Sequence, residues 1–420
     1  MSFETISVVG LGYIGLPTAA MFASRKKKVI GVDVNQYAVD TINRGNIHIV
    51  EPDLDMLVSA AVQQGYLKAV TTPEVADAFL IAVPTPFKEC ADGEIPEPDL
   101  RYIEAASKAI APVLKKGDLV ILESTSPVGA TEKMAAWLEK ARPDLSFPQT
   151  HGETADVNVA HCPERVLPGH VVTELVQNDR VIGGMSKRCS ERSVELYKTF
   201  VMGECIITNA RTAEMAKLTE NSCRDVQIAF ANELSMICDE LDIDVWELIS
   251  LSNRHPRVNI LQPGPGVGGH CIAVDPWFIV SKSPERAALI HTARLVNDGK
   301  PNWVKEKVNA AVVEYLNHNP EKTIKDITLA CYGLSFKPDI DDLRESPALE
   351  IAKSLAHTHS GKVIAIEPNI EELNIEGIKL VSLDESLSDA DIHVLLVDHK
   401  QFKKIKLNDS YIVDTKGIWN

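Results

Sequence analysis

The chain has 420 residues, which is more than one ordinary hydrophobic core accommodates, so two or three domains are expected. Hydrophobic residues make up 45% and charged residues 24%, the composition of a soluble globular protein and not of a disordered segment or a fibre. The net charge of −16 disfavours a nucleic-acid partner, no apolar run is long enough to span a membrane, and the eight cysteines contain no CxxC pair. We therefore expect a cytoplasmic protein without a metal site or a disulfide framework.

The first segment has the pattern of a dinucleotide-binding unit. A β-branched run at 5–9 precedes Gly10-Leu-Gly-Tyr-Ile-Gly15, and a helical pattern follows as far as Ala23. A second apolar run at 29–32 ends at Asp33. Strand, glycine-rich turn, helix, strand and acid in this order form a βαβ unit with a dinucleotide fingerprint.

Each residue of this fingerprint has a physical reason. Gly10 permits a tight turn, Gly12 lets the backbone approach a pyrophosphate, and Gly15 allows close packing of helix on strand. The helix N-terminus, with Tyr13 and Ile14 in the turn before it, offers N–H groups to the phosphates. Asp33 would accept hydrogen bonds from the adenosine ribose and repel a 2′-phosphate, so the predicted cofactor is NAD and not NADP. A structural turn with a solvated Asp33 is the alternative.

Later elements extend the pattern into two α/β regions. Apolar runs at 79–83 and 119–122 end in polar turns that contain Thr85 and Thr125, at the edge where parallel sheets bind ligands. A long amphipathic helix is predicted from 211 to 241. Past residue 325, a strand at 327–332, a helix at 346–356 and a strand at 363–366 form a second α/β unit without a complete GxGxxG. We predict an α/β protein in which a long helical connector joins two Rossmann-like, doubly wound domains, with boundaries at 1–205, 206–315 and 316–420.

Polar residues form a stripe on the long predicted helix. Glu214, Lys217, Asn221 and Arg224 are spaced 3, 4 and 3 residues apart, which places them on one face. A solvated face with ordinary ion pairs is one interpretation. Asparagine gains nothing on such a face, because it is a mediocre helix former. A lysine, an amide and an arginine in line would suit an anionic, hydroxyl-rich ligand.

The segment from His255 to Trp277 carries a cysteine behind a run of small residues, Gly-Pro-Gly-Val-Gly-Gly-His270-Cys271. Small neighbours let a bulky substrate reach the sulfur. A thiolate can attack an aldehyde to give a thiohemiacetal, which a hydride acceptor oxidises to a thioester. A buried structural thiol is the alternative. A metal site made by His270 and Cys271 is disfavoured, because no further ligands stand at suitable spacing.

Seven motifs occur in order over nearly the whole chain: GLGYIG, VPTP, ESTSPVG, CPERVLPG, EMAKLTENS, GPGVGGHCIAVDP and GLSFKPDIDDLRESP. In this set the chain resembles the UDP-glucose/GDP-mannose dehydrogenase family. UDP-glucose enzymes of that family usually have Ser before the cysteine and Pro-Lys-Asp after it. Here His270 precedes the cysteine and Ile-Ala-Val-Asp-Pro-Trp follows it, as in the branch that acts on 2-acetamido sugars.

The resemblance implies a reaction and residues for it. NAD would oxidise the C6 alcohol of a UDP-sugar twice, through an aldehyde to a carboxylate; the branch implies UDP-N-acetyl-D-mannosamine and the synthesis of bacterial surface polysaccharide. Cys271 would be the nucleophile, and Lys217 would stabilise the proton and the oxyanion with help from Asn221. Glu164 would position the water that hydrolyses the thioester, and Asp275 would have a supporting role.

The resemblance also implies binding residues. The resemblance implies a homodimer, in which the loop with His255 and Arg257 would reach the partner subunit's active site. The C-terminal domain would hold UDP. The nucleotide-sugar contacts would be Arg165, Val166, Lys217, Asn221, Arg224, Gly268, Phe336 and Lys337. The NAD contacts outside the fingerprint would be Thr85, Thr125, Thr131 and Arg344.

Three other functions stay open. The first is the same chemistry on UDP-N-acetylglucosamine or UDP-glucose. The second is a two-electron hydroxyacid dehydrogenase of similar layout, which needs no cysteine, so that Cys271 counts against it. The third is a non-catalytic, NAD-dependent regulator. Such a regulator would be expected to lack Cys271 or Lys217, and both are present.

Overall fold

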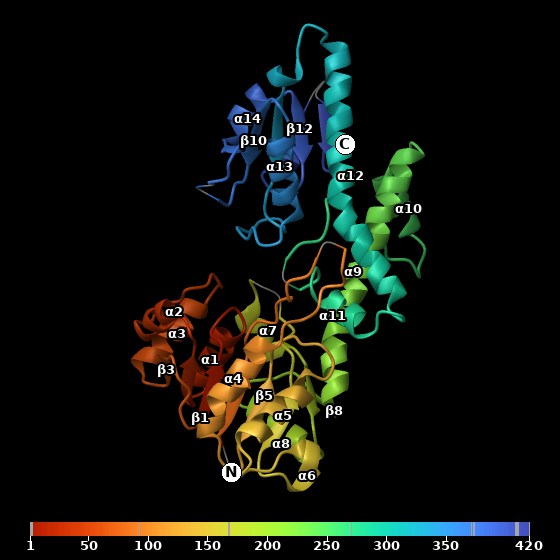
Figure 1. The fold of residues 1–420 in the computed structure, drawn as a ribbon. Coiled ribbons are helices and arrows are strands. Elements are labelled where there is room, and N and C mark those ends of the chain that lie inside the picture. Colours follow the sequence, from red (N-terminus) through yellow and green to blue (C-terminus); the bar gives the residue numbers. More distant parts are fainter. Residues whose placement is uncertain are drawn as a thin grey trace. The chain divides into compact units, whose positions relative to one another are not determined.

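The computed structural model describes residues 3–91, 93–166, 169–269, 271–370, 372, 374–407 and 411–419 (Figure 1). The chain divides into two compact units, Met1–Glu220 and Asn221–Asn420, and each is described by itself. The division falls within helix α9 (Ala210–Glu240). In the described part of the chain, no helix is long and apolar enough to cross a membrane.

The first unit is built on an eight-stranded sheet in the order β3-β2-β1-β4-β5-β6-β7-β8. Its strands are β1 (Thr5–Val9), β2 (Lys28–Val32), β3 (Leu67–Val70), β4 (Ala78–Ile81), β5 (Leu119–Leu122), β6 (Asn158–His161), β7 (Arg180–Gly184) and β8 (Cys205–Asn209). Its helices before α9 are α1 (Gly15–Ser24), α2 (Gln36–Asn43), α3 (Leu54–Gln63), α4 (Arg101–Ile110), α5 (Ala130–Ala141), α6 (Pro148–His151), α7 (Val171–Gln177) and α8 (Lys187–Tyr197).

Helices cover both faces of this sheet, because its strands are apolar on both sides. Val8 and Leu80 belong to the core that includes α1 and α3. Their neighbours Val9 and Phe79 belong to a second core that includes α4 and α5. Near-continuous apolar strands are the expected consequence of burial on two faces.

The predicted doubly wound sheet is present, with one departure from a purely parallel arrangement. Strands β1 to β6 pair in parallel, whereas β7 runs antiparallel to β6 and β8 runs parallel to β7. The chain turns back after His161 and does not cross the sheet before β7, which is the geometry that an antiparallel neighbour requires. Strands β7 and β8 were not among the strands predicted from the sequence.

The second unit contains a smaller, wholly parallel sheet in the order β11-β10-β9-β12-β13. Its strands are β9 (Thr328–Tyr332), β10 (Lys362–Ile366), β11 (Lys379–Leu380), β12 (Ile392–Leu395) and β13 (Tyr411–Asp414). Its helices after α9 are α10 (Val245–Ser252), α11 (Asp275–Lys282), α12 (Ala288–His318), α13 (Pro347–Thr358) and α14 (Leu383–Asp389). The predicted fold class, two Rossmann-like α/β regions with a helical region, is confirmed.

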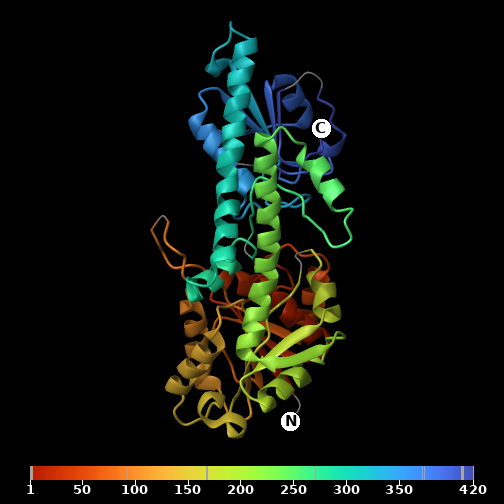
Figure 2. The ribbon, with the colours of Figure 1, turned by 90° about the vertical axis from the view of Figure 1, so that its right-hand side faces the viewer.

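Two long helices of the second unit lie side by side, α12 and the later part of α9 (Figure 2). Their interface contains buried polar groups: Arg294 donates to Asp225 at 2.6 Å, and Asn232 donates to Asn297 at 2.9 Å. Asn232 also accepts the backbone N–H of Gly264 at 2.9 Å, which attaches the glycine-rich loop to the helix pair. Buried polar pairs of this kind are costly if mismatched, so they fix the register of the two helices.

In both sheets the order in which successive strands are added reverses at one central strand, β1 in the first and β9 in the second. Strand β1 pairs with β2 on one side and β4 on the other, and β9 pairs with β10 and β12 in the same way. Open parallel sheets bind ligands at the carboxyl ends of the strands beside such a switch point. Each unit therefore has one edge at which a nucleotide site is expected.

Candidate functional site

The glycine-rich turn after β1 is held by backbone hydrogen bonds. The N–H of Gly10, whose φ is +91°, donates to Val32 O at 2.8 Å. Asp33 accepts the N–H of Leu11 on one oxygen at 2.8 Å and that of Asn35 on the other at 2.9 Å. A carboxylate has about four acceptor positions, so about two remain for ribose hydroxyls.

The space around this turn fits NAD. A Cβ on Gly15 would lie 1.7 Å from Gly10 O, so the turn requires glycine there, whereas a Cβ on Gly12 would meet nothing within 4 Å. The buried hydroxyl of Thr85, past the end of β4, has no hydrogen-bond partner in the described part of the chain. The first turn of α1 contains no acidic residue that would repel a phosphate. Open backbone, an unpaired hydroxyl and a helix N-terminus are what a pyrophosphate requires.

The other two predicted cofactor threonines differ from each other. Thr125 is half-buried in the turn after β5. Thr131 is fully buried, and its N–H and hydroxyl both donate to Glu214, at 2.8 and 2.6 Å. Gly129 N–H donates to the second oxygen of Glu214 at 2.6 Å. Through these hydrogen bonds Glu214 anchors the start of α5. Glu214 is 1% exposed, and burial raises its pKa, so it is not part of a solvated stripe.

Glu164 belongs to a buried charged cluster at the carboxyl end of the first sheet. One oxygen accepts the backbone N–H of Arg165 at 2.8 Å, and the other lies 2.7 Å from Nη1 of Arg180. Both side chains are buried, 6% and 3% exposed. Removing either partner of a buried ion pair leaves an uncompensated charge, so this pair holds the Glu164 side chain in one orientation.

A second carboxyl group faces the same arginine. Burial raises the pKa of Glu123 to about 7 against the attraction of Arg180, and Glu164 contributes in the same direction as burial. Tyr197 donates to Glu123 at 2.6 Å, and the guanidinium of Arg180 lies 4.9 Å from the centre of the Tyr197 ring. Burial also raises the pKa of Cys162 to about 12 and lowers that of His161 to about 3, so both remain neutral at pH 7. Of this cluster, only Glu164 was predicted from the sequence as a site residue.

The remaining predicted residues of the first unit lie nearer the surface. Arg165 is paired with Glu220 of α9 at 2.8 Å, and its guanidinium also donates to the backbone oxygen of Asp179. A phosphate at Arg165 would therefore have to displace or share this carboxylate. Val166 packs against the hydrophobic core, and Lys217 is half-buried on α9.

In the second unit, Cys271 begins the turn before α11 and is exposed. Its backbone oxygen accepts the N–H of Asp275 at 2.8 Å. The Asp275 carboxylate is buried and accepts a short hydrogen bond from the amide of Asn221. The structure thus brings together the predicted cysteine loop, its acid and the asparagine of the helix stripe, while His270 lies outside the described residues.

The glycine-rich loop packs against the segment that follows β9. A Cβ on Gly268 would lie 2.3 Å from Glu345 O and 2.9 Å from the Cβ of Phe336, so a larger residue would push the two segments apart. Beside this contact lies a cavity of about 530 Å³. Its lining includes Arg224, Gln262, Ser335, Phe336, Asp398 and Lys416. A basic, partly apolar cavity at a switch point suits a nucleotide diphosphate.

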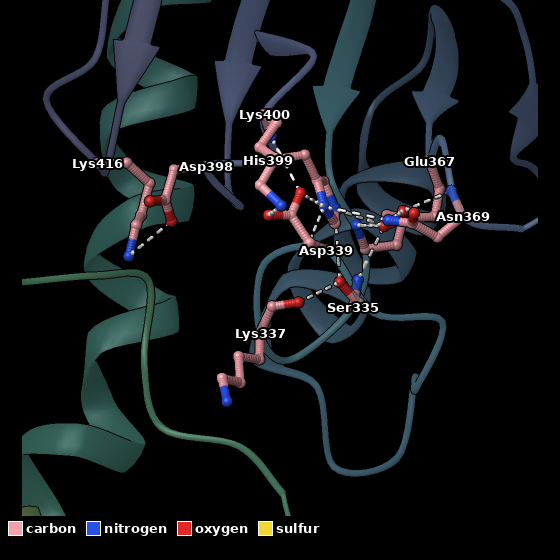
Figure 3. A network of polar contacts seen from close by, with 10 residues as sticks. Ser335, Lys337, Asp339, Glu367, Asn369, Asp398, His399, Lys400 and Lys416 are labelled. Atoms are coloured by element: carbon pink, nitrogen blue, oxygen red, sulfur yellow. Dashed lines mark hydrogen bonds and ion pairs between the residues drawn. The ribbon is translucent and has the colours of Figure 1, made fainter. Parts of the chain in front are cut away.

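Several predicted residues of the second unit lie outside this lining, among them Lys337, Arg344, His255 and Arg257. Lys337 is exposed, and its side chain extends away from the neighbouring hydrogen bonds (Figure 3). Arg344 forms an ion pair with Asp342 at 2.6 Å. His255 and Arg257 are exposed on the loop after α10. The binding roles of these four residues remain predictions.

Two groups of functional candidates were missed in the sequence. Arg180 and Glu123 surround Glu164, and Glu367, Asn369 and His399 surround the turn after β9. Glu367 follows the strand β10 just as Asp33 follows β2, which is a local signal that could have been noticed. Nothing local indicates the pairing of Arg180 with Glu164.

Comparison with known families agrees with this layout. Residues 4–201 match the NAD binding domain of the UDP-glucose/GDP-mannose dehydrogenase family, residues 211–299 its central domain, and residues 330–420 its UDP binding domain. The chain belongs to this family. Membership confirms the predictions of an enzyme, a NAD-dependent nucleotide-sugar dehydrogenase, and of NAD as its cofactor. The UDP binding domain agrees with a UDP-sugar as substrate.

Individual members of the UDP-glucose/GDP-mannose dehydrogenase family are similar over their full length. The chain is 68% identical to a UDP-N-acetyl-D-mannosamine dehydrogenase of Yersinia pestis, covering 100% of both chains. It is 63% identical to an NDP-N-acetyl-D-galactosaminuronic acid dehydrogenase of Ralstonia nicotianae, covering 100% of this chain and 97% of the relative. The solved structure of a UDP-D-ManNAc dehydrogenase from Pyrococcus horikoshii is 37% identical, with a TM-score of 0.86 over 99% of this chain and 96% of that one.

Substitution of two glycines should separate folding from cofactor binding. Gly15→Ala should destabilise the first unit by about 1–3 kcal/mol, because its Cβ would overlap Gly10 O. Gly12→Ala should leave thermal unfolding unchanged, because its Cβ meets no protein atom within 4 Å. It should weaken NAD binding by about tenfold or more, equivalent to about 1.4 kcal/mol of lost contact. Calorimetric NAD titration and thermal unfolding of both variants test this; equal NAD affinity in Gly12→Ala and wild type would show that the pyrophosphate does not lie there.

The raised pKa of Glu123 predicts a pH dependence of stability. A carboxyl that titrates at about 7 when folded and near 4.5 when unfolded stabilises the fold fully below its unfolded pKa, and this contribution is lost as the pH rises through 7. The loss corresponds to about 3 kcal/mol. Glu123→Gln should remove it, so the free energy of unfolding of wild type should fall relative to the variant between about pH 4 and 8. Urea unfolding of both proteins at several pH values measures the difference; a constant difference would show that Glu123 titrates normally.

Proposed function

We propose that the protein oxidises UDP-N-acetyl-D-mannosamine at C6 to UDP-N-acetyl-D-mannosaminuronate, a building block for bacterial surface polysaccharide. The observation that carries the chemistry is the exposed Cys271 next to the Asn221–Asp275 hydrogen bond and a nucleotide-sized cavity in the UDP binding domain's unit. The identity of the sugar is supported by the full-length similarity to relatives named for N-acetyl-D-mannosamine.

The protein groups divide the reaction into steps. Lys217 takes or stabilises the proton of the C6 hydroxyl as the alcohol becomes an aldehyde, and Asn221 donates to the same oxygen. The Cys271 thiolate then adds to the aldehyde carbon to form a thiohemiacetal, which the second oxidation converts into a thioester. When bound, NAD supplies the hydride acceptor for each oxidation. Water cleaves the thioester, releasing the carboxylate and restoring the thiolate.

The environment of Glu164 supports its assigned part in hydrolysis. Its contacts with Nη1 of Arg180 and the backbone N–H of Arg165 fix the direction in which the carboxylate points. Such a group is suited to orient a water molecule by accepting its hydrogen bond. We assign it this orienting role, with Asp275 supporting Asn221 in the other unit.

We also propose a homodimer in which the His255–Arg257 loop of one subunit completes the partner's site. Support comes from exposed apolar residues at helical spacing, Phe230 and Ile237 on α9 and Leu241 directly after it, which are 51%, 43% and 61% exposed. We also propose a reducing cytoplasm as the protein's location, because the eight cysteines have no CxxC pair and no regular spacing in the sequence.

A second substrate class is favoured by one comparison. The relative from Ralstonia nicotianae is named an NDP-N-acetyl-D-galactosaminuronic acid dehydrogenase and is almost as similar as the mannosamine relatives. The alternative substrate is therefore another UDP-2-acetamido sugar, including UDP-N-acetylglucosamine, before UDP-glucose.

Stoichiometry and substrate preference test the proposed reaction together. Exhaustive turnover of UDP-N-acetyl-D-mannosamine should give two NADH per sugar and a uronic acid, because both oxidations occur at one site. UDP-N-acetylglucosamine, UDP-N-acetylgalactosamine and UDP-glucose should react more slowly at equal concentration. Absorbance of NADH and mass spectrometry of the product provide the measurement. Release of a free aldehyde with one NADH would contradict the covalent mechanism, and a faster rate with another sugar would reassign the substrate.

Substitution of the cysteine and the lysine should separate the two oxidations. Cys271→Ser should complete part of the first oxidation and then stop, because serine without an adjacent base is a weak nucleophile. Lys217→Ala should slow both oxidations, by about 10²–10³, since it removes a donor to the developing oxyanion. Single-turnover NADH formation distinguishes these outcomes, with Cys90→Ser as the control at another exposed cysteine. A Cys271→Ser enzyme that forms acid at the wild-type rate would exclude the thioester.

A further inference from the structure

The loop of residues 334–339, which follows β9, is anchored by one buried carboxylate (Figure 3). Oε2 of Glu367 accepts the backbone N–H of Leu334 at 2.8 Å and that of Ser335 at 3.1 Å. The same oxygen lies 3.1 Å from Nε2 of His399, and Oε1 accepts the backbone and side-chain N–H groups of Asn369, each at 3.2 Å. Five donors surround two oxygens, so the carboxylate has little acceptor capacity left for a ligand.

This arrangement repeats and alters that of the first unit. Gly333 N donates to Ile366 O at 2.8 Å, as Gly10 N does to Val32 O, and Glu367 follows β10 as Asp33 follows β2. Asp33 is half-buried and accepts two backbone N–H groups, whereas Glu367 is 4% exposed and also faces an imidazole. The second carboxylate has therefore become an anchor for the turn and not a partner for ribose hydroxyls.

His399 connects the two ends of the loop. Its Nδ1 accepts the backbone N–H of Asp339 at 2.9 Å, so the ring proton resides on Nε2 and points to Glu367. Asp339 has a φ of +62°, and it is held further by the backbone N–H of Lys400 at 3.1 Å. The imidazole is fully buried and packs edge-on against Phe402, with ring centres 5.4 Å apart.

The opposite side of the loop faces the cavity. Ser335, Phe336 and Pro338 line it, as does Asp398, the residue before His399. The Ser335 hydroxyl donates to Lys337 O at 2.8 Å, which fixes the backbone of the lysine whose side chain extends away from the cluster (Figure 3). A loop tied at residues 334, 335 and 339 presents its middle residues in one conformation.

We propose that His399, acting through Glu367 and the N–H of Asp339, is a positioning residue for the nucleotide diphosphate of the substrate. It does not touch the ligand but preorganises the loop that carries Phe336 and Lys337. The proposal rests on the proposed function in that the cavity beside this loop binds the UDP part of a UDP-sugar. In this proposal the His399–Glu367 pair contributes to the affinity for UDP. Its contribution does not depend on the sugar or on the chemistry at Cys271.

The test compares UDP binding with NAD binding in the full-length chain. His399→Phe keeps the ring volume and the packing on Phe402. It removes the contacts of Nδ1 with the N–H of Asp339 and of Nε2 with Glu367. The Kd for UDP and the KM for the UDP-sugar should rise by about tenfold to a hundredfold, because buried partners are left unpaired and the loop loses its single conformation. The KM for NAD and the kcat at saturating UDP-sugar should stay within about twofold of the wild-type values, since neither depends on how well this loop is ordered before UDP binds.

Three further variants separate positioning from general destabilisation. His399→Gln can still donate to Glu367, and His399→Asn can still accept from Asp339; each should restore part of the UDP affinity lost in His399→Phe. His393→Gln is the matched control, a buried histidine on β12 that contacts Tyr332 and not the loop. It should lower the melting temperature without raising the Kd for UDP.

The outcomes distinguish this proposal from the proposed function. Unchanged UDP affinity in His399→Phe, or an equal loss in His393→Gln, would overturn the positioning role while leaving the function intact. If His399→Phe does not fold, equal affinities of His399→Gln, His399→Asn and wild type would overturn it in the same way. A wild-type chain that does not bind UDP, measured by calorimetry, would instead refute the nucleotide-sugar function itself.

Discussion

A carboxylate that accepts the backbone N–H groups of the turn after the first strand determines the layout of both units. In the first unit Asp33 holds Leu11, and in the second Glu367 holds Leu334 and Ser335. Charge-assisted hydrogen bonds are about twice as strong as neutral ones, so each turn is fixed relative to the next strand of its sheet. The position of this turn then determines which backbone groups face the switch point. Site geometry thus follows from one interaction between neighbouring strand ends.

The two units differ in the other groups that donate hydrogen bonds to this carboxylate, Asp33 in the first unit and Glu367 in the second. Asp33 remains half-buried, with acceptor positions left for a dinucleotide ribose. At Glu367 those positions are filled by Asn369 and by His399, which arrives from the loop after β12. Filling them removes one type of ligand contact and adds rigidity to the loop beside the cavity. A common supersecondary unit therefore serves two kinds of nucleotide through a change of two or three side chains, as expected if function resides in sites grafted on folds.

Much of the fold could be predicted because its signals are local. The fingerprint from Gly10 to Asp33 and the long helix at 211–241 depend on residues close in sequence, and the structure has α9 at Ala210–Glu240. The strands β7 and β8 and the helix α12, with Pro301 inside it, were not identified. Long-range partners were also missed: Glu214 anchors Thr131 and is not part of a solvated stripe, and Arg165 pairs with Glu220. Periodicity states which face a residue lies on but not which distant group meets it there.

The cysteine loop illustrates why such distant groups matter for chemistry. A flexible glycine-rich segment would present Cys271 in many positions, and glycine loses more conformational entropy on ordering than any other residue. Here Gly264 is held by Asn232 of the buried helix pair, Gly268 is confined against Phe336 and Glu345, and Asp275 is tied to Asn221. Each restraint comes from a segment remote in sequence, and together they define where the sulfur lies. In the proposed reaction a displacement of about 1 Å would cost the Cys271 nucleophile much of its advantage, so the polar layer between α9 and α12 would contribute to reactivity as well as to stability.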